Sequence, residues 1–402
     1  MRFRQSHQAT RPVWNGLNKH VRGISVLFLV YVIGWGVVNP YLPLYLRQLL
    51  GDYTRVGLVL SVVELFNLVW ALLIGPMLDR INKKTLISSV LVGYLPLSFI
   101  LLSLKTLTQF IWFRMYHSFI ATSLWLSSEA YLRGHTPQGK AAQTIGLFDF
   151  CQGLALVVGG LLGAVLITRI GFDILYATSF FALLALLVSL RLPDHTKSHI
   201  VTSLQSWRLS NITEEIGEYM RNRRLRNLTI YAFPFTFTVA FLGMVVPLFL
   251  ASIGASLPMV GLATALFNAP ILFESYFSMR QDHGQTVMLG LVFGAVLFLA
   301  LYTVEDPTTV LFLTILLGIA IAAVHPILAG RFTPLMPKRS IGEYSAVLYA
   351  TKGLAAGISP LMAGIIADTF GLRYVFLIGF IIFAGLLVFR KRCMEWNNGI
   401  SS

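Results

Sequence analysis

The sequence predicts an all-α membrane protein with about twelve transmembrane helices in two pseudo-symmetric six-helix bundles, and with both termini in the cytoplasm. Hydrophobic residues make up 56% of the 402 residues and charged residues only 12%, against roughly 45–50% and about 25% in soluble domains. Apolar runs long enough to cross roughly 30 Å of hydrocarbon recur along the chain. Because barrel-type alternation is missing, these runs must be helices.

A basic segment, residues 1–23, precedes the first apolar run. That run is too long for a signal-peptide core and has no small-residue cleavage pattern after it, so we expect it to be retained. The N-terminal bundle then covers 24–190, with helices expected at 24–46, 56–78, 86–104, 110–132, 145–167 and 174–190.

The one long polar stretch, 191–227, links the two halves. Its acidic residues come before its basic ones, in the order Glu214, Glu215, Glu218, Arg221, Arg223, Arg224 and Arg226. This order is typical of an amphipathic helix whose basic end lies near anionic lipid headgroups. We expect such a helix on the cytoplasmic face.

The second half, 228–389, repeats the first. Helices are expected at 228–253, 259–279, 287–304, 310–329, 344–366 and 374–389, before a tail at 390–402. The segment Pro43-Leu-Tyr-Leu46 recurs 204 residues later as Pro247-Leu-Phe-Leu250, and Gly153-Leu-Ala155 recurs 200 residues later as Gly353-Leu-Ala355. Two parallel six-helix halves are typical of secondary transporters.

The basic residues indicate topology. With the N-terminus inside, 24 of the 31 Lys and Arg residues fall in cytoplasmic segments, as the positive-inside rule requires. The net charge of +14 therefore does not indicate a nucleic-acid partner. We expect a multi-pass protein of a prokaryotic cell membrane.

Enzymatic chemistry is not expected. The sequence contains no Walker-type glycine loop, no hydrolytic triad and no metal-ligand spacing, and its two cysteines, Cys151 and Cys393, form no disulfide framework. We therefore expect no cofactor and no bound metal.

The residues after the second expected helix, Gly75-Pro-Met-Leu-Asp79-Arg80-Ile-Asn82-Lys83-Lys84, resemble the loop motif of the major facilitator superfamily. Asn82 stands where the motif has glycine, and asparagine tolerates the left-handed conformation, so we expect the turn to be kept. The eleventh helix is also similar to the family. The first, from Gly34 to Pro43, is similar to that of its drug and metabolite proton antiporters.

The resemblance implies that helix two faces helix eleven, and helix five faces helix eight, between the two bundles. Small residues in helices five and eleven independently predict close packing; they are Gly159, Gly160, Gly163, Gly357 and Gly364. Arg114 matches the superfamily's arginine in helix four, which arranges a proton site, although His117 and Ser118 replace the residues usual after it.

Charged side chains inside the bilayer suggest the functional site, because each costs about 2.5–3.5 kcal/mol at the bilayer centre. Glu64 is expected to pair with Arg114 or to reach Lys352. Asp149 and Glu274 are expected to approach one another and share a proton, because two carboxylates in a poorly solvated site do not both ionise easily. His325 is a further candidate proton carrier. Static internal ion pairs are the plain alternative.

Two further groups complete the expected site. A cytoplasmic gating motif contains Gly75, Asp79, Arg80, Lys83, Lys84 and Glu129, with the loop cations meeting Glu129 in the outward-open state. Candidate cavity-lining residues are Asn39, Tyr41, Gln152, Tyr231, Asn268 and Tyr349.

Together these features predict a secondary transporter of a small organic molecule that works by alternating access as a monomer in the lipid bilayer. Proton-coupled export is the first hypothesis. Uptake of a sugar, an organic acid or a siderophore-like solute by proton symport is the second. A non-transporting sensor or lipid scramblase on the same fold is the alternative from another class.

Overall fold

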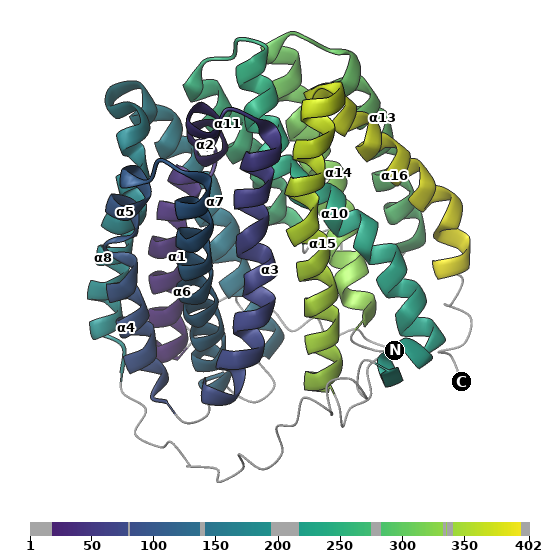
Figure 1. Ribbon diagram of the computed structural model, residues 1–402. Helices are drawn as coiled ribbons and strands as arrows, with labels where there is room; N and C mark the ends of the chain where they lie inside the picture. The colour runs from purple at the N-terminus through teal and green to yellow at the C-terminus, as the bar shows by residue number, and fades with distance from the viewer. Residues whose placement is uncertain are drawn as a thin grey trace, which may run out of the picture.

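The computed structural model describes residues 18–78, 81–136, 141–193, 217–274, 283–332, 335 and 341–394. All regular secondary structure in these ranges is helical, and the helices form two bundles side by side (Figure 1). The first bundle contains α1 (Lys19–Val38), α2 (Leu42–Leu50), α3 (Tyr53–Leu78), α4 (Lys83–Tyr94), α5 (Leu97–Ser103), α6 (Leu107–Gly134), α7 (Ala141–Ile170), η2 (Gly171–Tyr176) and α8 (Ala177–Leu190). The second contains α10 (Arg223–Ser252), α11 (Leu257–Asn268), η4 (Ala269–Phe273), α13 (His283–Thr303), α14 (Pro307–Phe332), α15 (Ile341–Phe370) and α16 (Leu372–Met394).

Three of the expected helices are interrupted, each of them at a proline. Pro40 separates α1 from α2, Pro96 separates α4 from α5, and Pro270 lies in the 3-10 turn η4 that follows α11. Proline lacks the backbone N–H that a continuous helix uses and clashes with the preceding turn, so a break at these positions is expected physically.

Nine helical stretches of the described residues are long and apolar enough to cross a membrane. They include α1, α10, α14 and a continuous stretch, 144–190, that covers most of α7 and all of α8. The all-helical class is therefore confirmed, whereas the number of spans and the side on which the termini lie stay predictions.

Only the end of the linker is described: residues 217–221, with Glu218 and Arg221, are helical, and a longer helix follows from Arg223. Residues 194–216, with Glu214 and Glu215, lie outside the described residues. The Asn222 side chain accepts hydrogen bonds from the backbone N–H groups of Arg224 and Leu225 and so caps α10. Arg223, Arg224 and Arg226 therefore belong to the beginning of α10.

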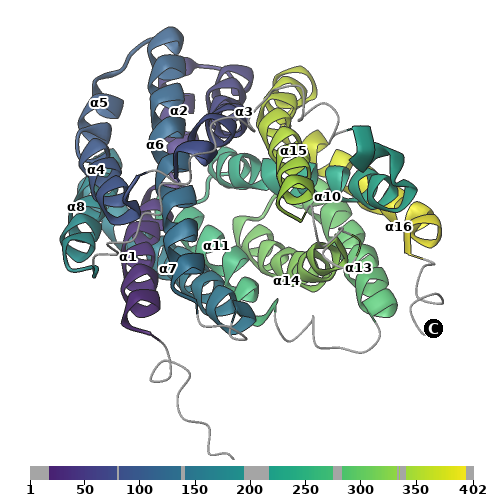
Figure 2. The same ribbon diagram turned by 90° about the horizontal axis from the view of Figure 1, so that it is seen from below.

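The two bundles meet along two helix pairs, α3 with α15 and α7 with α11, as the resemblance implied (Figure 2). Glycines make the contacts close. A Cβ atom on Gly57 would collide with the carbonyl of Pro360, and one on Gly160 would lie 2.8 Å from the Cβ of Ala265. We call this contact region the bundle interface.

Glycine also lets helices of one bundle approach closely, as the small-residue spacing predicts. A Cβ on Gly159 would lie 2.8 Å from the Cα of Gly36, and one on Gly163 would lie 2.8 Å from the carbonyl oxygen of Val37. Helices α1 and α7 therefore pack backbone to backbone.

The bundle interface is closed at one end and open at the other. We call the end at which α1 begins and α16 ends the linker side, and the other end the opposite side (Figure 1). At the opposite side α15 contacts the beginning of α3 closely enough that a Cβ on Gly364 would collide with the backbone of Tyr53. Toward the linker side the Tyr349 and His325 side chains are 53% and 52% exposed.

Candidate functional site

A cavity of about 200 Å³ lies in the bundle interface, between one helix of the first bundle and two of the second. Helix α3 contributes Glu64, Asn67 and Leu68, α10 contributes Thr236, and α15 contributes Tyr349, Lys352, Gly353 and Ala356. One carboxyl group and one amine therefore face the same space from different bundles.

Glu64 is held in place by its neighbour one helical turn away. The Asn67 side-chain amide donates to Oε2 of Glu64 at 3.3 Å. The Asn67 oxygen accepts hydrogen bonds from the hydroxyls of Ser118 and Thr122, at 2.8 and 2.9 Å. Because α6 fixes the amide in this way, the Glu64 carboxyl is oriented toward the cavity by a network rather than by an opposite charge.

Arg114 is buried behind this network, with 5% of its surface exposed. Its Nε donates to the carbonyl oxygen of Val59 at 3.3 Å, and its NH1 lies 3.2 Å from Nδ1 of His117. Arg114 attracts Glu64 electrostatically, but the structure shows no direct ion pair between these two described residues. Glu64 and Arg114 therefore interact electrostatically, while their hydrogen bonds go to Asn67 and to Val59 respectively.

Lys352 lines the cavity across from α3. Its Nζ lies 5.8 Å from the ring centroid of Phe332, within the range of a cation–π contact. Among the described residues Lys352 forms no ion pair. Lys352 and Glu64 therefore line the same cavity without contacting each other directly.

A second group of titratable side chains lies between the cavity and the linker side. Nδ1 of His325, on α14, lies 3.3 Å from Oε1 of Glu274, at the end of η4. Asp149, on α7, is close enough to interact electrostatically with Glu274, Glu129 and His325. The structure thus brings together the two carboxylates and the histidine that the sequence singled out.

The residues of the gating motif are only partly described. Gly75 lies in α3, while Asp79 and Arg80 lie outside the described residues. Glu129 forms an ion pair with Arg133 on its own helix. In this conformation Glu129 thus lies beside Arg133, and the described part of the chain shows no ion pair between it and Lys83 or Lys84.

Asn82 acts differently from the expected left-handed turn. Its φ is −59°, and its side chain accepts hydrogen bonds from the backbone N–H groups of Lys84 and Thr85. Asparagine at this position therefore caps α4, a role for which its side chain is well suited and which glycine performs without a hydrogen bond.

Two of the expected cavity-lining tyrosines face elsewhere. Tyr41 is fully buried, and its hydroxyl fills the space left by Gly261 on α11. Tyr231 is 2% exposed and donates to the carbonyl oxygen of Leu386. The expectation is wrong for both, because counting along a helix gives depth and not direction.

The other four expected residues differ among themselves. Asn39 is the C-cap of α1, and Asn268 donates to the carbonyl oxygen of Thr264. The Gln152 side-chain nitrogen is buried and has no hydrogen-bond partner among the described residues. Only Tyr349 of the set lines the cavity. Asn67 and Thr236 were missed, although Asn67 lies three residues after Glu64, where a helical neighbour is expected.

Known proteins share this architecture. The family model described as Major Facilitator Superfamily matches residues 24–280 and 228–392. The chain is similar to the uncharacterized MFS-type transporter MJ1560 of Methanocaldococcus jannaschii, with 21% identity over 93% of this chain and 98% of that protein. It is 23% identical to the multidrug resistance protein MdtG of Salmonella choleraesuis, over 90% and 91% of the two chains.

A solved structure resembles the fold. It is the bacterial homolog of the human lysosomal transporter Spinster, in an inward-facing and unoccupied conformation. The TM-score is 0.75 at 14% identity, and the match covers 96% of this chain and 97% of the other.

Proposed function

Because the chain belongs to the Major Facilitator Superfamily, whose members are integral membrane transporters and not enzymes, we propose that it is a secondary active transporter. It moves a small organic molecule by alternating access. The cavity carries this proposal, because both bundles line it and the bundle interface is closed at the opposite side and open toward the linker side. Rocking the bundles would reverse this arrangement and expose the same cavity to the other side.

The linker side is assigned to the cytoplasm by the positive-inside rule. The structure then corresponds to an inward-facing state, with the cavity reached from the cytoplasm. We place the protein, as a monomer, in the cell membrane of a prokaryote; relatives in an archaeon and a bacterium support this assignment.

Proton coupling is proposed for two groups of side chains. One comprises Glu64, Arg114 and Lys352 around the cavity, and the other comprises Asp149, Glu274 and His325 toward the linker side. The leading direction is export by proton antiport, which is supported by similarity to a protein named for multidrug resistance. The membrane potential adds about 2.3 kcal/mol per charge per 100 mV.

Reconstitution tests the proposed function. A thermal-shift screen of the purified protein against metabolites and drugs should identify stabilising compounds, because a ligand that binds only the folded state raises its stability. In proteoliposomes, an imposed pH gradient should then drive such a compound across the membrane. If every stabilising compound crosses at the rate of protein-free liposomes, the chain is not a proton-coupled transporter.

One observation favours the second direction, uptake by proton symport. Lys352 faces the cavity without an anionic partner among the described residues, and an organic acid would supply one. An anion and a proton carry opposite charges, so the binding of one favours the binding of the other, as symport requires. Antiport instead requires that substrate and proton compete for the transporter. The sign of the imposed gradient that drives accumulation distinguishes the two directions.

The gating motif is proposed to act when the linker side closes. Lys83, at the beginning of α4, should then replace Arg133 as the partner of Glu129. A double-mutant cycle of Lys83→Ala and Glu129→Ala should show a coupling of about 0.2–1 kcal/mol in the outward-open population. That population can be measured from distances between spin labels. If the effects of the two substitutions add without any coupling, Lys83 and Glu129 do not form this contact.

A further inference from the structure

The charges around the cavity are unequally matched. Glu64 accepts a hydrogen bond from Asn67 and is attracted by the buried Arg114. Lys352 faces the same cavity and makes only an aromatic contact with Phe332 among the described residues. The carboxyl group on the cavity wall therefore has protein partners, whereas the described residues place no anionic group against the amine.

An unmatched ammonium group inside a membrane protein is costly. Charged side chains within the bilayer are almost always paired, or face a cavity where a ligand or water meets them. The Phe332 ring contact offsets only part of this cost. An anion bound in the cavity would offset the rest of this cost.

The size and lining of the cavity favour a small partner. Its volume of about 200 Å³ is below the roughly 300–1,000 Å³ of pockets for drug-sized ligands. Thr236 and Asn67 provide polar groups on two walls, and Tyr349 provides an aromatic surface beside Lys352. These features favour a small molecule with one charged end and a short polar or aromatic body.

We propose that the cavity binds a small organic carboxylate, whose carboxyl group pairs with Nζ of Lys352. The inference rests on the proposed function, since it identifies the substrate class of the same cavity. Lys352 is the specificity-determining residue, because a compact ammonium selects a negative charge without requiring the planar geometry of a guanidinium. A neutral analogue of the same shape would leave this charge unmatched and bind more weakly.

Binding measurements on the purified full-length protein test the charge requirement. The probes are propionate, lactate and benzoate, each compared with its amide, together with benzylamine as a cation. We expect at least one carboxylate to stabilise the protein and to bind about tenfold or more tightly than its amide, a difference of about 1.4 kcal/mol. Equal binding of carboxylates and amides, preferred binding of the amine, or no stabilisation by any carboxylate would overturn the inference.

Substitution of Lys352 tests the residue. Lys352→Gln should remove the preference for carboxylate over amide, and Lys352→Arg should keep most of it. Lys105→Gln, in the loop between α5 and α6 at the opposite side, is the matched control and should change nothing. If Lys352→Gln folds and keeps the preference for carboxylate over amide, Lys352 does not bind the carboxylate. If Lys352→Gln does not fold, the inference is still tested by the carboxylate and amide affinities of the wild-type protein and of Lys352→Arg.

The two proposals can fail separately. If a carboxylate binds through Lys352 but no pH gradient drives any compound across liposomes, the proposed function fails while the binding site stands. If a neutral or cationic compound is accumulated and carboxylates are not bound, the chain is a transporter and the inferred substrate class is wrong.

Discussion

Replacing Glu64 with glutamine should abolish gradient-driven accumulation while substrate exchange continues. Glutamine keeps the shape of the side chain and can still accept the hydrogen bond from Asn67, but it cannot bind and release a proton. The bundles could then carry substrate in both directions without coupling to the gradient. We expect accumulation at the level of protein-free liposomes, with measurable counterflow. The Glu274 carboxyl group lies beside His325, and we expect the same result for Glu274→Gln.

A carboxyl group outside the cavity provides the control for this experiment. Glu305 lies in an exposed loop at the opposite side and pairs with Arg373. Glu305→Gln should leave both accumulation and counterflow unchanged. If Glu64→Gln and Glu274→Gln accumulate substrate fully, these carboxyl groups do not couple transport to protons. If a variant loses both accumulation and counterflow, the substitution has damaged substrate binding or the transport cycle itself.

The fold was largely predictable because it follows from average properties of long segments. Apolar length and composition require membrane helices, and the repeat of Pro43-Leu-Tyr-Leu46 as Pro247-Leu-Phe-Leu250 predicts two related halves. Helix ends were less predictable. Helix α10 begins at Arg223 and not near 228, because a single asparagine, Asn222, caps it.

The site was predictable in depth but not in direction. Glu64 and Lys352 were found because charged residues are rare inside apolar helices, and both line the cavity together with the expected Tyr349. Tyr41 and Tyr231 also lie in apolar stretches, but they face the interior of the protein. A helix that is apolar on every side carries no amphipathic pattern to indicate which face meets the cavity.

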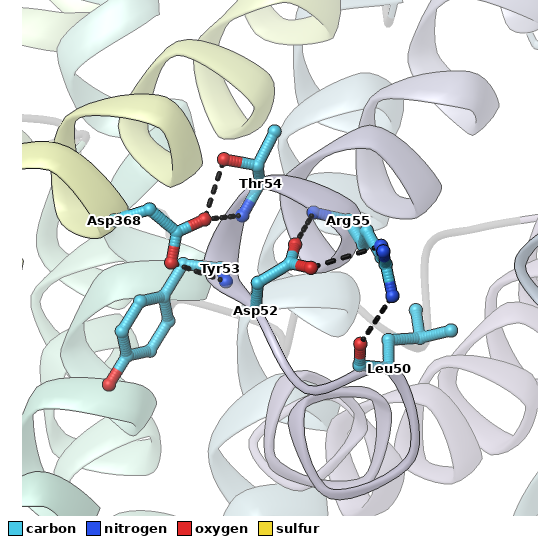
Figure 3. Close-up of polar contacts among 6 residues, drawn as sticks. All are labelled: Leu50, Asp52, Tyr53, Thr54, Arg55 and Asp368. Atoms are coloured by element: carbon cyan, nitrogen blue, oxygen red, sulfur yellow. Dashed lines mark hydrogen bonds and ion pairs between the residues drawn. The ribbon is translucent and has the colours of Figure 1, made fainter.

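The contact that closes the opposite side could not be predicted from local sequence, because its two partners are 314 residues apart. The Asp368 carboxylate on α15 accepts hydrogen bonds from the backbone N–H groups of Tyr53 and Thr54, at 3.0 and 2.7 Å, and from the Thr54 hydroxyl at 2.6 Å (Figure 3). Asp52 satisfies the next N–H group, that of Arg55. The first turn of α3 is thus capped partly by its own bundle and partly by the other.

Replacing Asp368 with alanine should open the opposite side. The substitution removes three hydrogen bonds to a carboxylate and its favourable interaction with the positive end of the α3 dipole, all of which exist only while the bundles touch there. Because the site is exposed to solvent, we expect a modest shift of about tenfold toward the state that is open at the opposite side, or about 1.4 kcal/mol. Distances between spin labels on the two bundles at that side would measure it.

Asp306 provides a control with nearly the same chemistry. It caps α14 at the same side, where its carboxylate accepts hydrogen bonds from the backbone N–H and the hydroxyl of Thr309, both at 2.7 Å. That cap lies within one bundle, so Asp306→Ala should weaken the helix end and leave the distance distribution unchanged. Thr54→Val, which removes only the hydroxyl contact with Asp368, should give a smaller shift than Asp368→Ala. Equal distributions for Asp368→Ala and Asp306→Ala would mean that the cap joins the bundles without helping to set their equilibrium.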